Sequence, residues 1–143
     1  MLQIKLVSLL VNDQAKALAF YTSKLGFVKK TEIDLGGGGL KWISIASPGQ
    51  DDNGVQISLE PSTHFDFVTT YQKEIYQNNI PATAFAVDDI EQEYELLKGK
   101  GVEFRSEPST MPDGTKLAIL DDTVGNWIQI YQIQSKTEDT SGD

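Results

Sequence analysis

The sequence has no cysteine, only one histidine, and far fewer basic than acidic residues. Its 143 residues include 21 Asp and Glu but 12 Lys and Arg, which gives a formal net charge of −9. The absence of cysteine excludes disulfides, thiolate zinc sites and cysteine nucleophiles. Few Lys and Arg argue against a nucleic-acid partner, whose phosphates are bound through clustered basic side chains. A solvated acidic surface is the first interpretation of this charge, and attraction of a cationic ligand is the second.

The chain also lacks a long hydrophobic run. Its apolar start, MLQIKLVSLLVND, is too short and too alternating for a signal or membrane segment. We therefore expect a cytoplasmic protein with no membrane partner. The length predicts one domain over residues 1–134 with a sizeable core. Residues 135–143 are polar and acidic, and they are predicted to form a disordered tail.

What the sequence does contain is a pattern that occurs twice. VNDQAKALAFYTSKLGFV (11–28) and VDDIEQEYELLKGKGVEF (87–104) both begin Val-x-Asp and turn on a glycine after a helix-length amphipathic run. Asp13 and Asp89 are predicted N-caps, and Gly26 and Gly101 are predicted helix stops. The buried helix stripes are predicted to comprise Ala17, Leu18, Phe20, Tyr21 and Leu25, and then Ile90, Tyr94 and Leu97.

Strands are predicted around each of these helices. In the first half they cover residues 2–11, 28–35, 40–47 and 55–60, and in the second half residues 82–87, 102–104, 116–122 and 127–133. Each half is therefore β-α-β-β-β. Module one spans about 2–60 and module two about 81–134, joined by a connector over 61–80 with a helical piece. This internal repeat predicts an α+β fold of two tandem βαβββ modules.

Two short motifs add a family resemblance. F-Y-x-x-x-L-G-F occurs at 20–27 and D-x-x-G-N at 122–126. With these motifs, residues 3–133 resemble the glyoxalase, bleomycin-resistance and extradiol-dioxygenase superfamily, also called vicinal oxygen chelate. The resemblance implies a curved, eight-stranded mixed sheet that partly encloses a central cavity. It also implies a homodimer, because members often pair their modules within or between chains.

The resemblance further implies four positions at which metal-dependent members carry His, His, Glu and Glu. In this sequence they fall on Leu6, Ala82, Gln129 and Ser58, or on Glu60 if that strand is shifted by two residues. Leucine and alanine bind no metal, and an amide oxygen is a poor anchor for a transition metal. The single histidine, His64, lies in the connector and is interpreted as a surface or packing residue. No metal ligand and no cofactor are predicted, although a divalent metal at an atypical site is left open.

Strand alternation predicts the groups that a cavity would offer instead. The predicted ligand-binding residues are Trp42, Gln56, Ser58, Glu60, Trp127, Gln129 and Tyr131. Glu60, if it points inward, is the candidate general base or cation anchor. The alternative is that the aromatic rings simply pack the sheet against the helices. Arg105 and the Asp121–Asp122 pair are predicted to be surface or turn residues.

Three functions remain open at this point. The preferred one is a metal-free module that binds a small molecule in the sheet cavity, as the bleomycin-resistance branch does. The alternative is a glyoxalase-like lyase or dioxygenase with an atypical metal site, or one that uses Glu60 as a carboxylate base. The third is a regulatory or interaction role with a closed cavity.

Overall fold

The computed structural model describes residues 1–51 and 53–133, and over these the chain forms the predicted two modules. Module one contains β1 (Leu6–Val11), α1 (Gln14–Ala19), η1 (Phe20–Lys24), β2 (Val28–Asp34), β3 (Lys41–Ala46) and β4 (Gln56–Pro61). Module two contains β5 (Pro81–Ala86), α3 (Ile90–Gly99), β6 (Ser109–Thr110), β7 (Lys116–Asp121) and β8 (Trp127–Gln132), and α2 (Asp66–Gln77) connects the two modules. The predicted tail at 135–143 lies outside the described residues.

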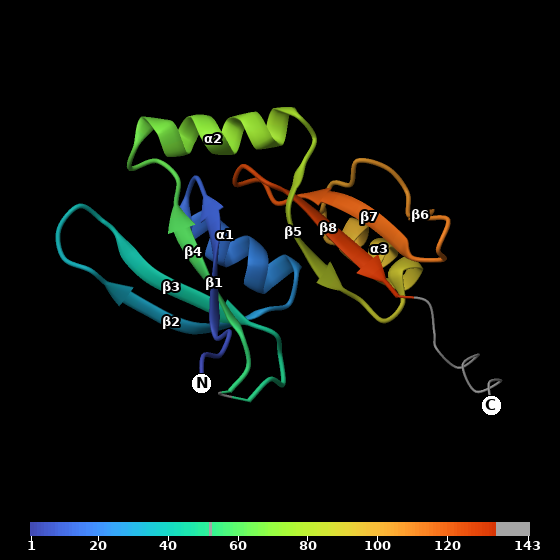
Figure 1. The fold of residues 1–143 in the computed structure, drawn as a ribbon, viewed down its shortest axis with the longest axis horizontal. Coiled ribbons are helices and arrows are strands. Elements are labelled where there is room, and N and C mark those ends of the chain that lie inside the picture. The colour runs from blue at the N-terminus through green and yellow to red at the C-terminus, as the bar shows by residue number, and fades with distance from the viewer. Residues whose placement is uncertain (52, 134–143) are drawn as a thin grey trace.

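The eight strands are divided between two four-stranded sheets. Sheet one has the order β1-β4-β3-β2, and sheet two has the matching order β5-β8-β7-β6. In each sheet the first strand pairs parallel with the last, and the other pairs are antiparallel. Figure 1 shows the modules side by side, with α2 above module one and its C-terminal end leading into β5 of module two. The α+β class and the tandem βαβββ repeat are confirmed.

The predicted helix signals are present in both modules. The Asp13 carboxylate accepts a hydrogen bond from the Lys16 backbone N–H, and the Asp89 carboxylate accepts one from the Gln92 N–H. The chain then leaves each helix through a glycine with positive φ, 83° at Gly26 and 90° at Gly101. Such a backbone strongly favours glycine, which explains the repeated stop.

Two local features differ from the sequence-based prediction. The first helix continues as a five-residue π-helix, η1, in which the Leu25 N–H donates to the Phe20 carbonyl. Such π turns are rare, and they occur mostly as single turns inside α-helices. In module two the strand predicted at 102–104 is reduced to one bridge, between Phe104 and Leu120, and β6 lies further along the chain.

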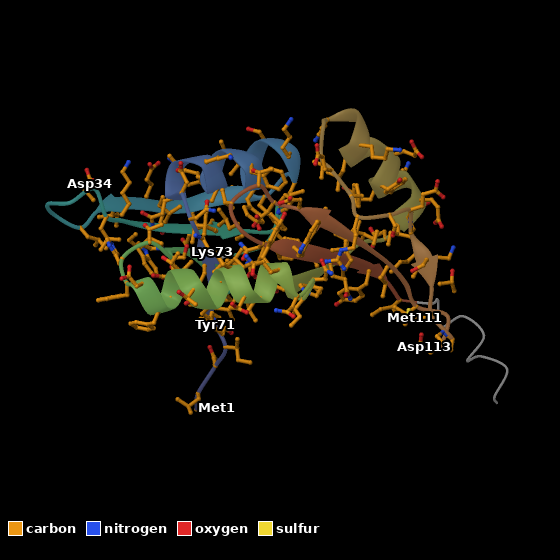
Figure 2. The ribbon with its side chains drawn as sticks, turned by 90° about the horizontal axis from the view of Figure 1, so that it is seen from above. Met1, Asp34, Tyr71, Lys73, Met111 and Asp113 are labelled. Atoms are coloured by element: carbon orange, nitrogen blue, oxygen red, sulfur yellow. The ribbon has the colours of Figure 1, made fainter. Side chains whose placement is uncertain are left out.

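A continuous hydrophobic core joins the two modules on one side of the sheets. It includes Leu9, Val11, Ala17, Tyr21, Ile43, Ile45 and Leu59 from module one and Ile90, Leu97, Leu120, Ile128 and Ile130 from module two. Because strand side chains alternate, the other face of each sheet points away from this core. We call these two surfaces the open faces. Figure 2 shows α1 and α3 on one side of the strands and α2 on the other side.

Candidate functional site

The open face of sheet one carries the predicted residues of module one. Ser44 and Ser58 lie in register, and Gln56, Ser58 and Glu60 follow one another on the same face of β4. The Ser44 hydroxyl donates to Gln56 Oε1 at 2.7 Å, and the Ser58 hydroxyl donates to the Glu60 carboxylate. The structure therefore brings three of the predicted residues into one polar row. Trp42 lies on the same face, two residues before Ser44 on β3.

Ser44 was not predicted as a site residue. The signal was available, because Trp42 and Ser44 alternate with buried isoleucines in the strand KWISIA. Both Ser44 and Ser58 are buried, whereas Leu6 and Ile33 on the same open face are 45% and 55% exposed. Ser8 and Thr31 extend this polar row, because they lie in register with Ser58 and Ser44. Polar groups thus lie beside exposed apolar side chains on this face, a combination found in small-molecule sites.

The open face of sheet two carries the predicted residues of β8. Gln129 lies in register with Ala84 and Ile119, and Tyr131 with Ala86 and Leu117. Both side chains are only partly buried. The alanines of β5 leave the amide and the phenol without large neighbours on that side. The structure therefore places Gln129 and Tyr131 together on sheet two, while Trp42, Gln56, Ser58 and Glu60 occupy sheet one.

Trp127 begins β8 and is in contact with α2. The Tyr76 ring stacks on the indole with centroids 4.9 Å apart and planes 4° apart, and the indole N–H donates to the Tyr76 carbonyl oxygen at 3.0 Å. The Arg105 guanidinium carbon lies 4.5 Å from the centroid of the same indole. Arg105 therefore has a specific contact in addition to its exposed position. Sequence reasoning missed Tyr76 because its partner belongs to a distant strand.

Tyr76 is itself fixed by a carboxylate. Its hydroxyl donates to Asp121 Oδ2 at 2.7 Å, and this hydrogen bond raises the pKa of Tyr76 to about 12, with a smaller contribution from desolvation. The phenol is neutral at physiological pH and acts as a hydrogen-bond donor. Asp121, Tyr76 and Trp127 thus form a chain of contacts from the β7–β8 turn through α2 to the open face of sheet two.

The two motifs that suggested the family meet inside the protein. The Tyr21 hydroxyl donates to Asp122 Oδ2 at 2.5 Å, and the Asn126 side-chain amide donates to the same oxygen at 2.8 Å. Asp122 is completely buried, so the prediction of a surface or turn residue is wrong for its side chain. The reason is long-range: its partner Tyr21 lies 101 residues earlier in the chain.

This buried network has perturbed acidities. Burial raises the pKa of Asp122, although its four hydrogen bonds act in the opposite direction. Burial, with the neighbouring Asp122 carboxylate, raises the pKa of Tyr21 well above its ordinary value. Asn126 also donates to the Leu10 carbonyl of β1 at 2.8 Å. The network therefore joins both modules.

The family's usual metal ligands do not fit the residues present. Leu6 faces the open side of sheet one, Ala82 lies in a bulge of β5, and the Ser58 hydroxyl donates a hydrogen bond to the Glu60 carboxylate. Among residues 1–51 and 53–133, no group of three or more His, Cys, Asp or Glu side chains is placed to hold an ion. His64 is exposed in the loop before α2.

Comparison with known proteins settles the family. The model of the Glyoxalase/Bleomycin resistance protein/Dioxygenase superfamily matches residues 3–130. The chain belongs to this superfamily. One relative is the uncharacterized protein YurT of Bacillus subtilis (strain 168). It is 46% identical to this chain over 131 residues, which cover 92% of this chain and 99% of that protein.

Solved structures show the superfamily fold as well. UcmS2 superposes with a TM-score of 0.75 at 27% identity, covering 92% of this chain and 98% of that one. TnmS3, an antibiotic binding protein from Streptomyces sp. CB03234, superposes with a TM-score of 0.67 at 23% identity, covering 94% and 98%. At that identity the likeness to TnmS3 extends to the fold alone. Within the described part of the chain, no helix is long and apolar enough to cross a membrane.

Proposed function

We propose that this protein binds a small aromatic or cationic organic molecule on its open sheet faces, without a divalent ion between protein and ligand. The observation that carries the proposal is the pair of hydrogen bonds Ser44–Gln56 and Ser58–Glu60 on an open face that also carries Trp42 and the exposed side chains of Leu6 and Ile33. Hydrogen-bonding groups within apolar and aromatic surroundings are typical of ligand sites. That TnmS3, which shares this fold, is an antibiotic binding protein is consistent with such a role.

Glu60 supplies the charge preference. Its carboxylate is only partly buried, and the Ser58 hydroxyl holds it on the open face. A carboxylate fixed in this way attracts a cationic group of a ligand, and the net charge of −9 acts in the same direction. Trp42 on the neighbouring strand offers an aromatic surface for stacking.

We propose further that a second copy of the chain completes the site. The predicted residues are divided between two sheets, and apolar side chains such as Leu6, Val28 and Ile33 are exposed on the open face of sheet one. If the open face of sheet one packed against the open face of sheet two in a second copy, these apolar side chains would be covered. Light scattering on purified protein tests this directly. A dimer mass supports the arrangement, and a monomer mass at high protein concentration contradicts it.

The binding function is tested by tryptophan fluorescence in chelator-containing buffer. The probes are metal-free bleomycin and ethidium, a planar aromatic cation. We expect a saturable change in tryptophan fluorescence for at least one probe. In Glu60→Gln that probe should bind about tenfold more weakly, which corresponds to a loss of ~1.4 kcal/mol in binding free energy. Glu95→Gln is the matched control, because Glu95 is exposed on α3, across the sheets from the open faces. No saturable change for either probe, or equal loss in both variants, contradicts the proposal.

The second candidate is an enzyme in which Glu60 is a general base. The Ser58–Glu60 hydrogen bond favours it, because a positioned carboxylate is what proton abstraction requires. A lyase or dioxygenase assay separates the two functions. Turnover that is lost in Glu60→Gln supports catalysis, whereas binding without product supports the first proposal.

A further inference from the structure

A separate cleft, with polar and charged side chains among its walls, lies between α2 and the β7–β8 turn. Its volume is about 470 Å³, within the range of small-molecule sites. Its walls come from α2, the β1–α1 loop, the segment after β4 and the β7–β8 turn. None of the seven residues predicted to bind ligand on the open faces lines it. In Figure 2 Lys73 marks the side of α2 toward this cleft, and Tyr71 marks the opposite side.

Ser62, which lines the cleft, carries a hydroxyl without a partner. The side chain is buried, and its Oγ makes no hydrogen bond with any residue that the structure describes. Both backbone groups of Ser62 are satisfied: the N–H donates to the Val11 carbonyl, and the carbonyl accepts from the Thr69 hydroxyl at 2.7 Å. Buried hydroxyls are nearly always hydrogen-bonded, so this exception calls for an explanation. Because Ser62 lines the cleft, a ligand group bound there would supply one.

The cleft also holds one cation and one anion that do not pair with each other. Within the described part of the chain, the Lys73 ammonium group forms no ion pair or hydrogen bond. Asp121 accepts from the Tyr76 hydroxyl at 2.7 Å and from the Thr123 N–H at 2.8 Å, both neutral donors. These bonds fix the carboxylate but leave its negative charge without a cation.

We propose that this cleft binds a small zwitterion, with its ammonium group at Asp121, its carboxylate at Lys73 and a hydrogen bond to Ser62. Both free α-amino acids and short peptides carry this pair of charges. They differ in the distance between the charges, which grows with each added residue. The proposal is independent of the open-face function, because a different set of residues forms the cleft.

The structure supplies a spectroscopic reporter for this cleft. Tyr76 contacts Asp121 through its hydroxyl and Trp127 through its ring. The chain has two tryptophans, so Trp42→Phe leaves Trp127 as the single tryptophan, which can be excited selectively over the tyrosines. A ligand that binds Asp121 is expected to shift the Tyr76 side chain and so change the Trp127 emission.

The test titrates Trp42→Phe protein with glycine, glycylglycine and triglycine, with glycolate and ethylamine as singly charged controls. Calorimetry on the unsubstituted protein repeats the measurement without relying on fluorescence. We expect saturable binding of at least one zwitterion, about tenfold or more tighter than either control. The tightest member identifies an amino acid or a peptide as the natural class. No binding of any zwitterion, or equal binding of the singly charged controls, overturns the proposal.

Variants distinguish a ligand group from a structural one. Ser62→Ala removes an unpartnered hydroxyl, so we expect an equal or higher Tm together with at least about tenfold weaker zwitterion binding. Lys73→Gln should weaken binding similarly, whereas Lys16→Gln, at an exposed lysine on α1, should not. A lower Tm in Ser62→Ala with unchanged binding would show that the hydroxyl is structural.

Discussion

Replacing Tyr21 by phenylalanine tests the buried contact that joins the two modules. The substitution removes only the hydroxyl, which donates to Asp122 at 2.5 Å in a completely buried environment. Hydrogen bonds to charged groups contribute about 1.5–3 kcal/mol, and here Asp122 would lose one of its four donors. At about 2–4 °C per kcal/mol for a chain of this size, we expect Tm to fall by about 3–12 °C.

The pH dependence gives the same prediction a second readout. Since burial raises the pKa of Tyr21 well above its ordinary value, the folded state disfavours the phenolate more than the unfolded state does. The stabilisation is therefore complete below about pH 10 and decreases by ~1.4 kcal/mol per pH unit above it. The Tyr21→Phe variant has no hydroxyl at this position and therefore lacks this pH-dependent contribution to stability. The difference in unfolding free energy between the two proteins should shrink between about pH 9 and about pH 11.

Urea denaturation across this pH range provides the measurement. Tyr71→Phe is the matched control, because Tyr71 is 60% exposed and its hydroxyl has no hydrogen-bond partner among the described residues. It should change the free energy of unfolding by no more than about 0.5 kcal/mol. If Tyr21→Phe behaves like this control, or keeps the alkaline dependence of the unsubstituted protein, the proposed role of the Tyr21–Asp122 contact is refuted.

Two further predictions concern the backbone and α2. Gly101→Ala should lower the free energy of unfolding by about 1–2 kcal/mol in chemical denaturation, because φ at Gly101 is 90°, whereas Gly99→Ala within α3 should be neutral or stabilising. Equal effects of the two substitutions would argue against the glycine stop. Gln72 is the only buried residue of α2, and its amide lies 3.1 Å from the Leu10 carbonyl oxygen and 3.2 Å from the Val124 carbonyl oxygen. Gln72→Leu should therefore speed hydrogen exchange in α2 while the strands stay protected, and unchanged exchange in α2 would contradict that role.

The features that the sequence predicts well are those with local causes. Asp13 and Asp89 cap their helices through hydrogen bonds within three residues, and the glycine stops follow from backbone conformation alone. Strand alternation likewise places Ser58 and Glu60 on one face, because the period of a strand is fixed by its geometry. These signals are sufficient for the repeat and for the fold class.

The features that it predicts poorly depend on contacts between distant segments. The burial of Asp122 requires Tyr21 from the other module, and the contact of Trp127 with α2 requires Tyr76 to fold back over β8. Nothing near Asp122 in the sequence distinguishes a buried aspartate from a turn residue. The division of the predicted ligand-binding residues between two separate sheets also follows from tertiary arrangement, which strand periodicity alone does not determine.

The central claim is that the open faces bind an organic ligand directly, with no divalent ion at the family's usual positions. The most direct test is the metal content per chain after incubation with zinc, nickel, iron(II) and manganese(II) followed by desalting. The account predicts no stoichiometric metal, and no difference between the unsubstituted protein and Glu60→Gln. One retained ion per chain that disappears in Glu60→Gln would contradict the claim and identify Glu60 as a ligand of an atypical metal site.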